Sequence, residues 1–214
     1  KATLLSSSLL SRSRRLRLVT YLPSRPAKGE SLMENIMVSV GGLALNEEGR
    51  LPLKSRLDEY LPQFKGQKVG VVSATGEVSY EAAKQPIFIH DLFRHTAGLS
   101  YGGRGNTPVH KMYPGGTTVA AVEMNSEEFL AKISSLPLVY QPGTTWDYGF
   151  ATDVLGLVIE KVSGQRLGDY LKSAVWDKVR MPDTAFTVPE EKKKRIARLL
   201  PIDPITGKPQ RVLL

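Results

Sequence analysis

The stretch YQPGTTWDYGFATDVLGLVIEKVSGQRLGDYL (residues 140–171) shows the strongest local pattern in the chain. Its first part contains Pro, Gly and aromatic residues, which is typical of a loop. From about Thr152 to Ser163 apolar residues recur at helical spacing, and Gly164 stands where a left-handed residue would end the helix. The segment therefore predicts an aromatic loop that leads into a buried helix, with another helix starting at about Leu167.

Two more helices are indicated outside this stretch. Apolar residues at i, i+4 and i+7 predict a helix from about Ile36 to Gly49. Gly41 and Gly42 inside it either weaken the helix by about 1 kcal/mol each or mark close packing against another element. Asn125 and Glu128 have the spacing of a capping box and predict the start of a helix there.

A hairpin and a long loop are expected in the middle of the chain. VGVVSATGEVSY (69–80) predicts two short strands joined by a tight turn. A helix from about Ile87 to His95 should expose Asp91 to solvent. The glycine-rich residues 100–118 follow, and a loop of that length is typically a binding loop, a lid or a disordered segment.

The composition excludes several classes of protein. The 214 residues contain no Cys, which removes disulfides, thiolate metal sites and cysteine nucleophiles. No apolar run approaches the roughly 18 residues of a membrane span. The net charge of +8 is concentrated in residues 1–29, which hold seven basic residues and no acid. The remainder is close to neutral, so we expect no positively charged surface of the kind that binds nucleic acid.

The chain divides into two parts by composition. Residues 1–30 form a basic tail rich in Ser and Arg, which we expect to be disordered or foreign to the domain. An organellar targeting peptide is the alternative, although a cytoplasmic location is favoured. Residues 31–214 are expected to contain the folded domain.

The three histidines do not predict a metal site. His90 and His95 are five residues apart, so their rings would lie about 140° apart around a regular helix. His110 stands alone in the glycine-rich segment. We therefore expect capping or surface roles for these residues, and no metal or other cofactor.

Three stretches in a fixed order carry a family resemblance: IHDLFRHTAGLSYG (89–102), the opening stretch (140–171) and RMPDTAFTV (180–188). Together they resemble the serine hydrolases of the class C β-lactamase and penicillin-binding protein group, and most of all its family VIII carboxylesterases. The resemblance spans about residues 36–189. It implies an α+β fold of the β-lactamase/transpeptidase type. From the resemblance we expect the fold to be incomplete here, with mainly the helical lobe present and part of the central antiparallel sheet missing.

The resemblance also implies a set of site residues. Members of the group use a Ser-x-x-Lys nucleophile motif, a nearby Tyr as general base, and an acyl-enzyme intermediate. The family motif that carries this tyrosine maps onto Tyr148-Gly149-Phe150, so Tyr148 is the candidate base. Trp146, Phe150 and Tyr101 are the candidate substrate-binding residues. The implied substrate is a small ester or amide.

The nucleophile motif itself is not found. A gapless register places it on Leu32-Met33-Glu34-Asn35, so that Leu32 replaces the serine and Asn35 replaces the lysine. No Ser-x-x-Lys occurs anywhere in the chain, and Ser31, one position too early, is the alternative nucleophile. We therefore predict that the chain as it stands cannot form an acyl-enzyme.

Two other functions remain open from the sequence. A non-catalytic scaffold on the same fold could bind peptides or cell-wall fragments near Tyr148. A basic-tailed protein could use residues 1–29 on nucleic acid or an anionic membrane. Separately, the apolar stripe of Ile36, Val40 and Leu43 would lose its usual partner sheet, which predicts an uncovered patch and self-association.

Overall fold

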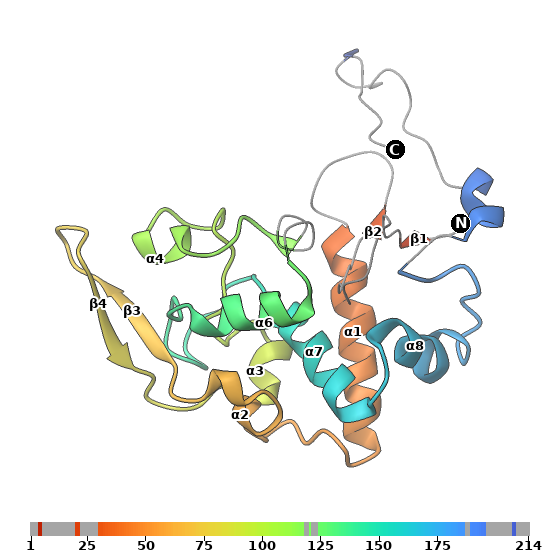
Figure 1. Cartoon of the computed structure of the whole chain (residues 1–214), viewed down its shortest axis with the longest axis horizontal. Coiled ribbons are helices and arrows are strands. Elements are labelled where there is room, and N and C mark those ends of the chain that lie inside the picture. The colour runs from red at the N-terminus through yellow and green to blue at the C-terminus, as the bar shows by residue number, and fades with distance from the viewer. Residues whose placement is uncertain are drawn as a thin grey trace.

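A computed structural model of the chain describes residues 4–5, 20–21, 30–117, 120, 124–186, 189–195 and 207–208. The described part is a body of helices with one projecting hairpin (Figure 1). The predicted tail, residues 1–30, falls mostly outside the described ranges. The described parts are the short strands β1 (Leu4–Leu5) and β2 (Thr20–Tyr21) and Glu30, which is already the first residue of a helix. No helix within the described ranges is both long enough and apolar enough to cross a membrane.

The longer helices occur in the expected places, with shifted ends, whereas α4 (Pro108–Lys111) forms within residues 100–118, which were expected to be a loop; the Thr107 side chain caps it by accepting from the backbone N–H of His110. The longer ones are α1 (Glu30–Glu47), α6 (Ser126–Ser135) and α7 (Ala151–Ser163). The short helices are α2 (Leu57–Tyr60), α3 (Ile89–Phe93), α4 (Pro108–Lys111) and α8 (Leu167–Leu171). The remaining turns are η1 (Pro62–Phe64), the π-helical η2 (Lys172–Trp176) and η3 (Glu190–Arg195).

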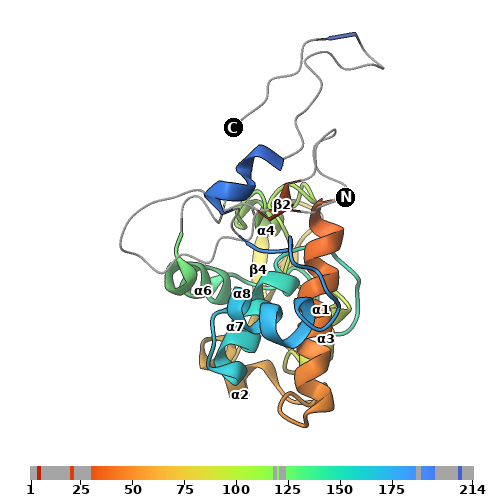
Figure 2. The ribbon, with the colours of Figure 1, turned by 90° about the vertical axis from the view of Figure 1, so that its right-hand side faces the viewer.

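The first long helix, α1, begins six residues earlier than the sequence predicts. Its two glycines allow close packing against other elements, which is one of the two roles that the sequence left open for them. A Cβ at Gly41 would overlap Leu171, and one at Gly42 would lie 2.7 Å from the ring of Phe93. Tyr170 Oη also donates a hydrogen bond to the carbonyl oxygen of Gly41 at 3.1 Å. Figure 2 shows the result, in which α1 runs along one edge of the molecule with α7 and α8 on one side of it.

The predicted helix at 152–163 is the buried centre of the body. In α7 every residue from Ala151 to Ile159 is buried. Gly164 ends the helix with φ of 73°, the left-handed conformation expected of it. The capping box of α6 is present as predicted, with Asn125 Oδ1 accepting from the backbone N–H of Glu128.

The predicted hairpin is also confirmed. Strands β3 (Lys68–Val72) and β4 (Val78–Ala82) pair antiparallel and project from the helical body (Figure 1). The hairpin is attached through the backbone of Leu138, whose N–H and carbonyl bond to Lys68 and Gly70.

The apolar stripe on α1 is uncovered among the described residues. Ile36, Val40 and Leu43 are 42%, 40% and 43% exposed. Their spacing places all three on one face of the helix. An apolar patch is thus present where the sequence predicts one, while the self-association expected from it stays a prediction.

Candidate functional site

The proposed base, Tyr148, lies in the loop just before α7 and contacts α1. Asn35 Nδ2, in the second turn of α1, donates a hydrogen bond to Tyr148 Oη at 3.1 Å. The two residues are 113 positions apart in sequence. The structure therefore places the residue that the gapless register assigns to the missing lysine directly against the candidate tyrosine.

The nucleophile position lies one turn earlier on the same helix. Ser31 and Leu32 both belong to the first turn of α1. Positions three and four residues apart share a helix face, so both precede Asn35 on the side of the helix that Asn35 occupies. The side chains of Ser31 and Leu32 lie outside the described residues.

A histidine that the sequence did not predict here packs on Tyr148. The His95 ring centroid lies 4.8 Å from that of Tyr148. The backbone N–H of Asp147 donates to the His95 carbonyl oxygen at 2.9 Å, which attaches the tyrosine loop to this residue. Burial lowers the pKa of His95, against a smaller opposing effect from Asp147. The neutral imidazole is therefore the form that packs against the phenol.

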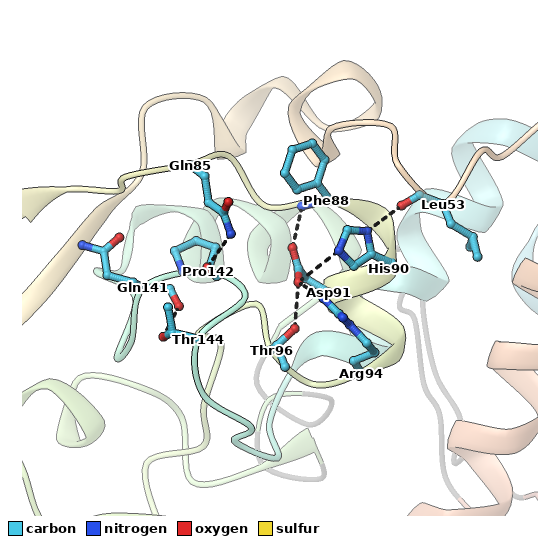
Figure 3. A network of polar contacts seen from close by, with 10 residues as sticks. All are labelled: Leu53, Gln85, Phe88, His90, Asp91, Arg94, Thr96, Gln141, Pro142 and Thr144. Carbon is cyan, nitrogen blue, oxygen red and sulfur yellow. Dashed lines mark hydrogen bonds and ion pairs between the residues drawn. The ribbon is translucent and has the colours of Figure 1, made fainter.

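The turn that carries His95 is held by Asp91, and here a sequence expectation was wrong. Asp91 was expected on the surface, but its exposed fraction is 0%. Its Oδ1 accepts from Thr96 Oγ1 at 2.7 Å and from Arg94 Nη2 at 3.0 Å, and its Oδ2 accepts from the backbone N–H of Phe88 (Figure 3). Three donors offset the desolvation of the carboxylate, so its burial is tolerated.

The same turn fixes the start of the tyrosine loop. The backbone N–H of Gly143 donates to the Thr96 carbonyl oxygen at 2.8 Å. Gln85 Nε2 donates to the neighbouring Pro142 carbonyl at 2.7 Å, as Figure 3 also shows. Together with the bond from Asp147 N–H to the His95 carbonyl, these contacts hold the loop at its start and just before Tyr148.

Close backbone packing explains the glycine in the Tyr148-Gly149-Phe150 motif. A Cβ at Gly149 would lie 2.5 Å from Ser100 Cα and would also overlap the carbonyl oxygen of Leu99. Only glycine lets the two backbone segments approach this closely.

The three proposed substrate-binding residues differ in exposure. Trp146 is 60% exposed, and the guanidinium carbon of Arg104 lies 5.7 Å from its ring centroid. Tyr101 is half-buried, with its ring edge-to-face with Tyr148 at 5.6 Å. Phe150, in contrast, is completely buried, and its ring packs on Tyr101 and Phe129. In this structure Phe150 supports the site from beneath, without a face open to a ligand.

The described residues contain no group of three or more His, Asp or Glu that could hold a metal ion. His90 Nδ1 instead lies 3.1 Å from the Leu53 carbonyl oxygen. His110 is buried, with Nδ1 2.6 Å from Thr107 Oγ1. These two histidines have local structural partners.

Comparison with known proteins identifies the family. The beta-lactamase family profile matches residues 36–211, most of the chain. The chain belongs to the beta-lactamase family, and so to the serine hydrolases that the sequence motifs resemble. The α+β β-lactamase/transpeptidase-like fold is thereby confirmed, in partial form.

Individual relatives are distant and longer. Protein Rv1367c from Mycobacterium tuberculosis is 31% identical over 166 residues, which cover 75% of this chain and 39% of that protein. Esterase EstB from Burkholderia gladioli is 28% identical over 160 residues, covering 73% of this chain and 38% of EstB. The chain thus spans about two fifths of the length of these relatives.

Solved structures show the same fold. Simvastatin synthase LovD from Aspergillus terreus has a TM-score of 0.64 at 21% identity, covering 92% of this chain and 51% of LovD. At that identity the likeness establishes the fold alone.

Proposed function

We propose that the chain carries an ester-type serine hydrolase site in which the nucleophile and its activating amine are replaced, so that it binds small esters or amides without forming an acyl-enzyme. The hydrogen bond between Asn35 and Tyr148 carries this proposal. It supports the register in which Asn35 occupies the position of the lysine and Leu32 that of the serine.

The chemistry of these two replacements explains the expected inactivity. A carboxamide donates a neutral hydrogen bond to the Tyr148 oxygen, but it carries no positive charge to stabilise a phenolate and takes up no proton near neutrality. A leucine side chain has no oxygen to attack a carbonyl. Acylation therefore lacks both the amine that would activate the nucleophile and the nucleophile itself.

The remaining side chains support binding of a small carbonyl compound. Tyr148 and Tyr101 provide phenol groups, and the exposed ring of Trp146 offers an apolar surface on the other side of His95, which packs on Tyr148. The family contains a relative named esterase, EstB, which favours esters as the ligand class.

Covalent labelling tests the proposal directly. The full chain is treated with a fluorophosphonate probe and assayed on p-nitrophenyl butyrate. We expect no labelled serine and no turnover. A probe adduct on Ser31 would show that the gapless register is wrong and would overturn the proposal.

A gain-of-function variant provides the complementary test. The double substitution Leu32→Ser with Asn35→Lys restores the motif on the face that meets Tyr148. We expect probe labelling at position 32 in this variant and a strong loss of labelling when Tyr148→Phe is added. Equal labelling with and without the tyrosine would contradict its role as base.

A non-catalytic peptide- or cell-wall-binding role is the second candidate, favoured by the exposed Trp146 with Arg104 above it. Binding of a cell-wall peptide would quench Trp146 fluorescence. Trp176, which is 2% exposed, supplies a matched reference. We expect quenching to vanish in Trp146→Phe and to persist in Trp176→Phe if this role is correct.

A further inference from the structure

Two hydroxyl groups connect a buried carboxyl group to the candidate site. Asp153, in the first turn of α7, is only 5% exposed. Thr117 Oγ1 donates to Asp153 Oδ2 at 3.2 Å, and the same Oγ1 lies 2.7 Å from Tyr101 Oη. A hydroxyl has a single proton, so a threonine that donates to the carboxylate can only accept from the tyrosine.

The ring of Tyr101 is held as firmly as its hydroxyl. It packs edge-to-face against Tyr148 on one side and against Phe150, at 4.5 Å between centroids, on another. Packing fixes the ring, while the O–H bond can still rotate about the C–O bond. The contact with Thr117 Oγ1 at 2.7 Å is one that acts on the direction of this O–H bond.

The chain of contacts joins segments that are distant in sequence. Tyr101 and Thr117 stand at the two ends of the glycine-rich segment, whose base is closed by a hydrogen bond from Gly102 N–H to the Pro114 carbonyl at 2.8 Å. Asp153 comes five residues after Tyr148. The helix that follows the candidate base is thereby also linked, through Thr117, to Tyr101, whose ring packs against Tyr148.

We propose that Asp153, acting through Thr117, is a positioning residue that sets the direction of the Tyr101 hydroxyl proton beside Tyr148. When Thr117 donates to the carboxylate, the Tyr101 proton points to Thr117, and the phenol oxygen presents only lone pairs elsewhere. When a donor stands at position 153, the order of hydrogen bonds reverses and Tyr101 becomes a donor on its other side. A ligand carbonyl would need the arrangement in which Tyr101 donates to it. A ligand N–H or O–H would need the arrangement in which the Tyr101 oxygen offers a lone pair. This consequence for ligands rests on the proposed function.

Matched variants at position 117 test the relay in the full chain. Thr117→Val keeps the shape and removes the hydroxyl, whereas Thr117→Ser keeps the hydroxyl. The readout is the 13Cζ resonance of Tyr101 in tyrosine-labelled protein, assigned by its loss in Tyr101→Phe. Spectra are recorded well above pH 7, because burial raises the pKa of Asp153 to about 7.

We expect Asp153→Asn to shift the Tyr101 resonance in the wild-type and Thr117→Ser backgrounds and to leave it unmoved in Thr117→Val. An equal shift in Thr117→Val, or no shift in the wild-type background, would overturn the proposal. If Thr117→Val does not fold, Thr117→Ala replaces it in the same comparison. The measurement needs no substrate, so a failed relay and a failed proposed function give separate results: labelled Ser31 would overturn only the latter.

Discussion

Asp153→Asn should remove a pH-dependent loss of stability that the buried carboxyl imposes on the fold. Burial raises the pKa of Asp153 from 3.8 to about 7, with the hydrogen bond from Thr117 opposing the rise. Between these values the folded chain keeps a proton that the unfolded chain has released. The free energy of unfolding therefore falls as the pH rises from about 4 to about 7.

The size of this effect follows from the two pKa values. At about 1.4 kcal/mol per pH unit, the interval from 3.8 to about 7 corresponds to about 4 kcal/mol once the carboxyl is fully ionised. Asparagine is neutral throughout and does not incur this loss. The free energy of unfolding of the variant, taken relative to that of the wild type, should rise by on the order of 4 kcal/mol between acid pH and pH 8. This corresponds to roughly 10 °C in Tm.

The assay is urea unfolding of both proteins at several pH values. An amide in place of an acid also changes one hydrogen bond, at a pH-independent cost of about 1–3 kcal/mol, so the quantity to compare is the pH slope of the difference. Asp169→Asn, which removes an exposed carboxylate from α8, serves as the control. The reasoning is refuted if the difference in free energy of unfolding between Asp153→Asn and wild type is the same at pH 5 and at pH 8.

Four further outcomes are expected. Gly149→Ala should destabilise the fold by about 1–3 kcal/mol in urea unfolding, because its Cβ meets backbone, whereas Gly156→Ala, whose Cβ meets only the flexible end of Leu167 at 3.0 Å, should have a smaller effect. Asn35→Lys should raise the phenolate absorbance of the chain at alkaline pH through the charge placed at Tyr148 Oη, and Tyr148→Phe should abolish the increase. Because the pKa of His95 is lowered below 6.5 in the fold, His95 destabilises the chain as the pH falls through that value; His95→Asn should flatten this acid-side loss, and an unchanged pH profile would argue against neutral burial. Light scattering should show concentration-dependent association that Val40→Glu abolishes, while Val71→Glu, at an equally exposed valine on β3, leaves it intact.

Local signals predicted most of the helices and the hairpin. The capping box at Asn125 and the left-handed Gly164 depend on backbone geometry within a few residues, and such preferences act before any tertiary contact forms. The same is true of the turn between β3 and β4. The start of α1 was missed because Glu30–Asn35 carries no strong cap and was assigned in part to the basic tail.

Polar burial was harder to predict. Asp91 was expected on the surface because its helical position and charge both favour solvent, yet it is buried. The donors that make this possible belong to Phe88, Arg94 and Thr96, and whether they converge on one carboxylate depends on how the chain turns after α3. Periodicity carries no information about such convergence.

The sequence by itself determined the family motifs, the central helix, and the absence of a Ser-x-x-Lys, because each is a matter of residue identity at short spacing. Only the tertiary structure decided that Asn35 meets Tyr148, that His95 packs on the same ring, and that Thr117 links Tyr101 to Asp153. These contacts join segments up to 113 residues apart. Their formation depends on how buried helices pack together and satisfy polar groups in the core, which no local pattern encodes.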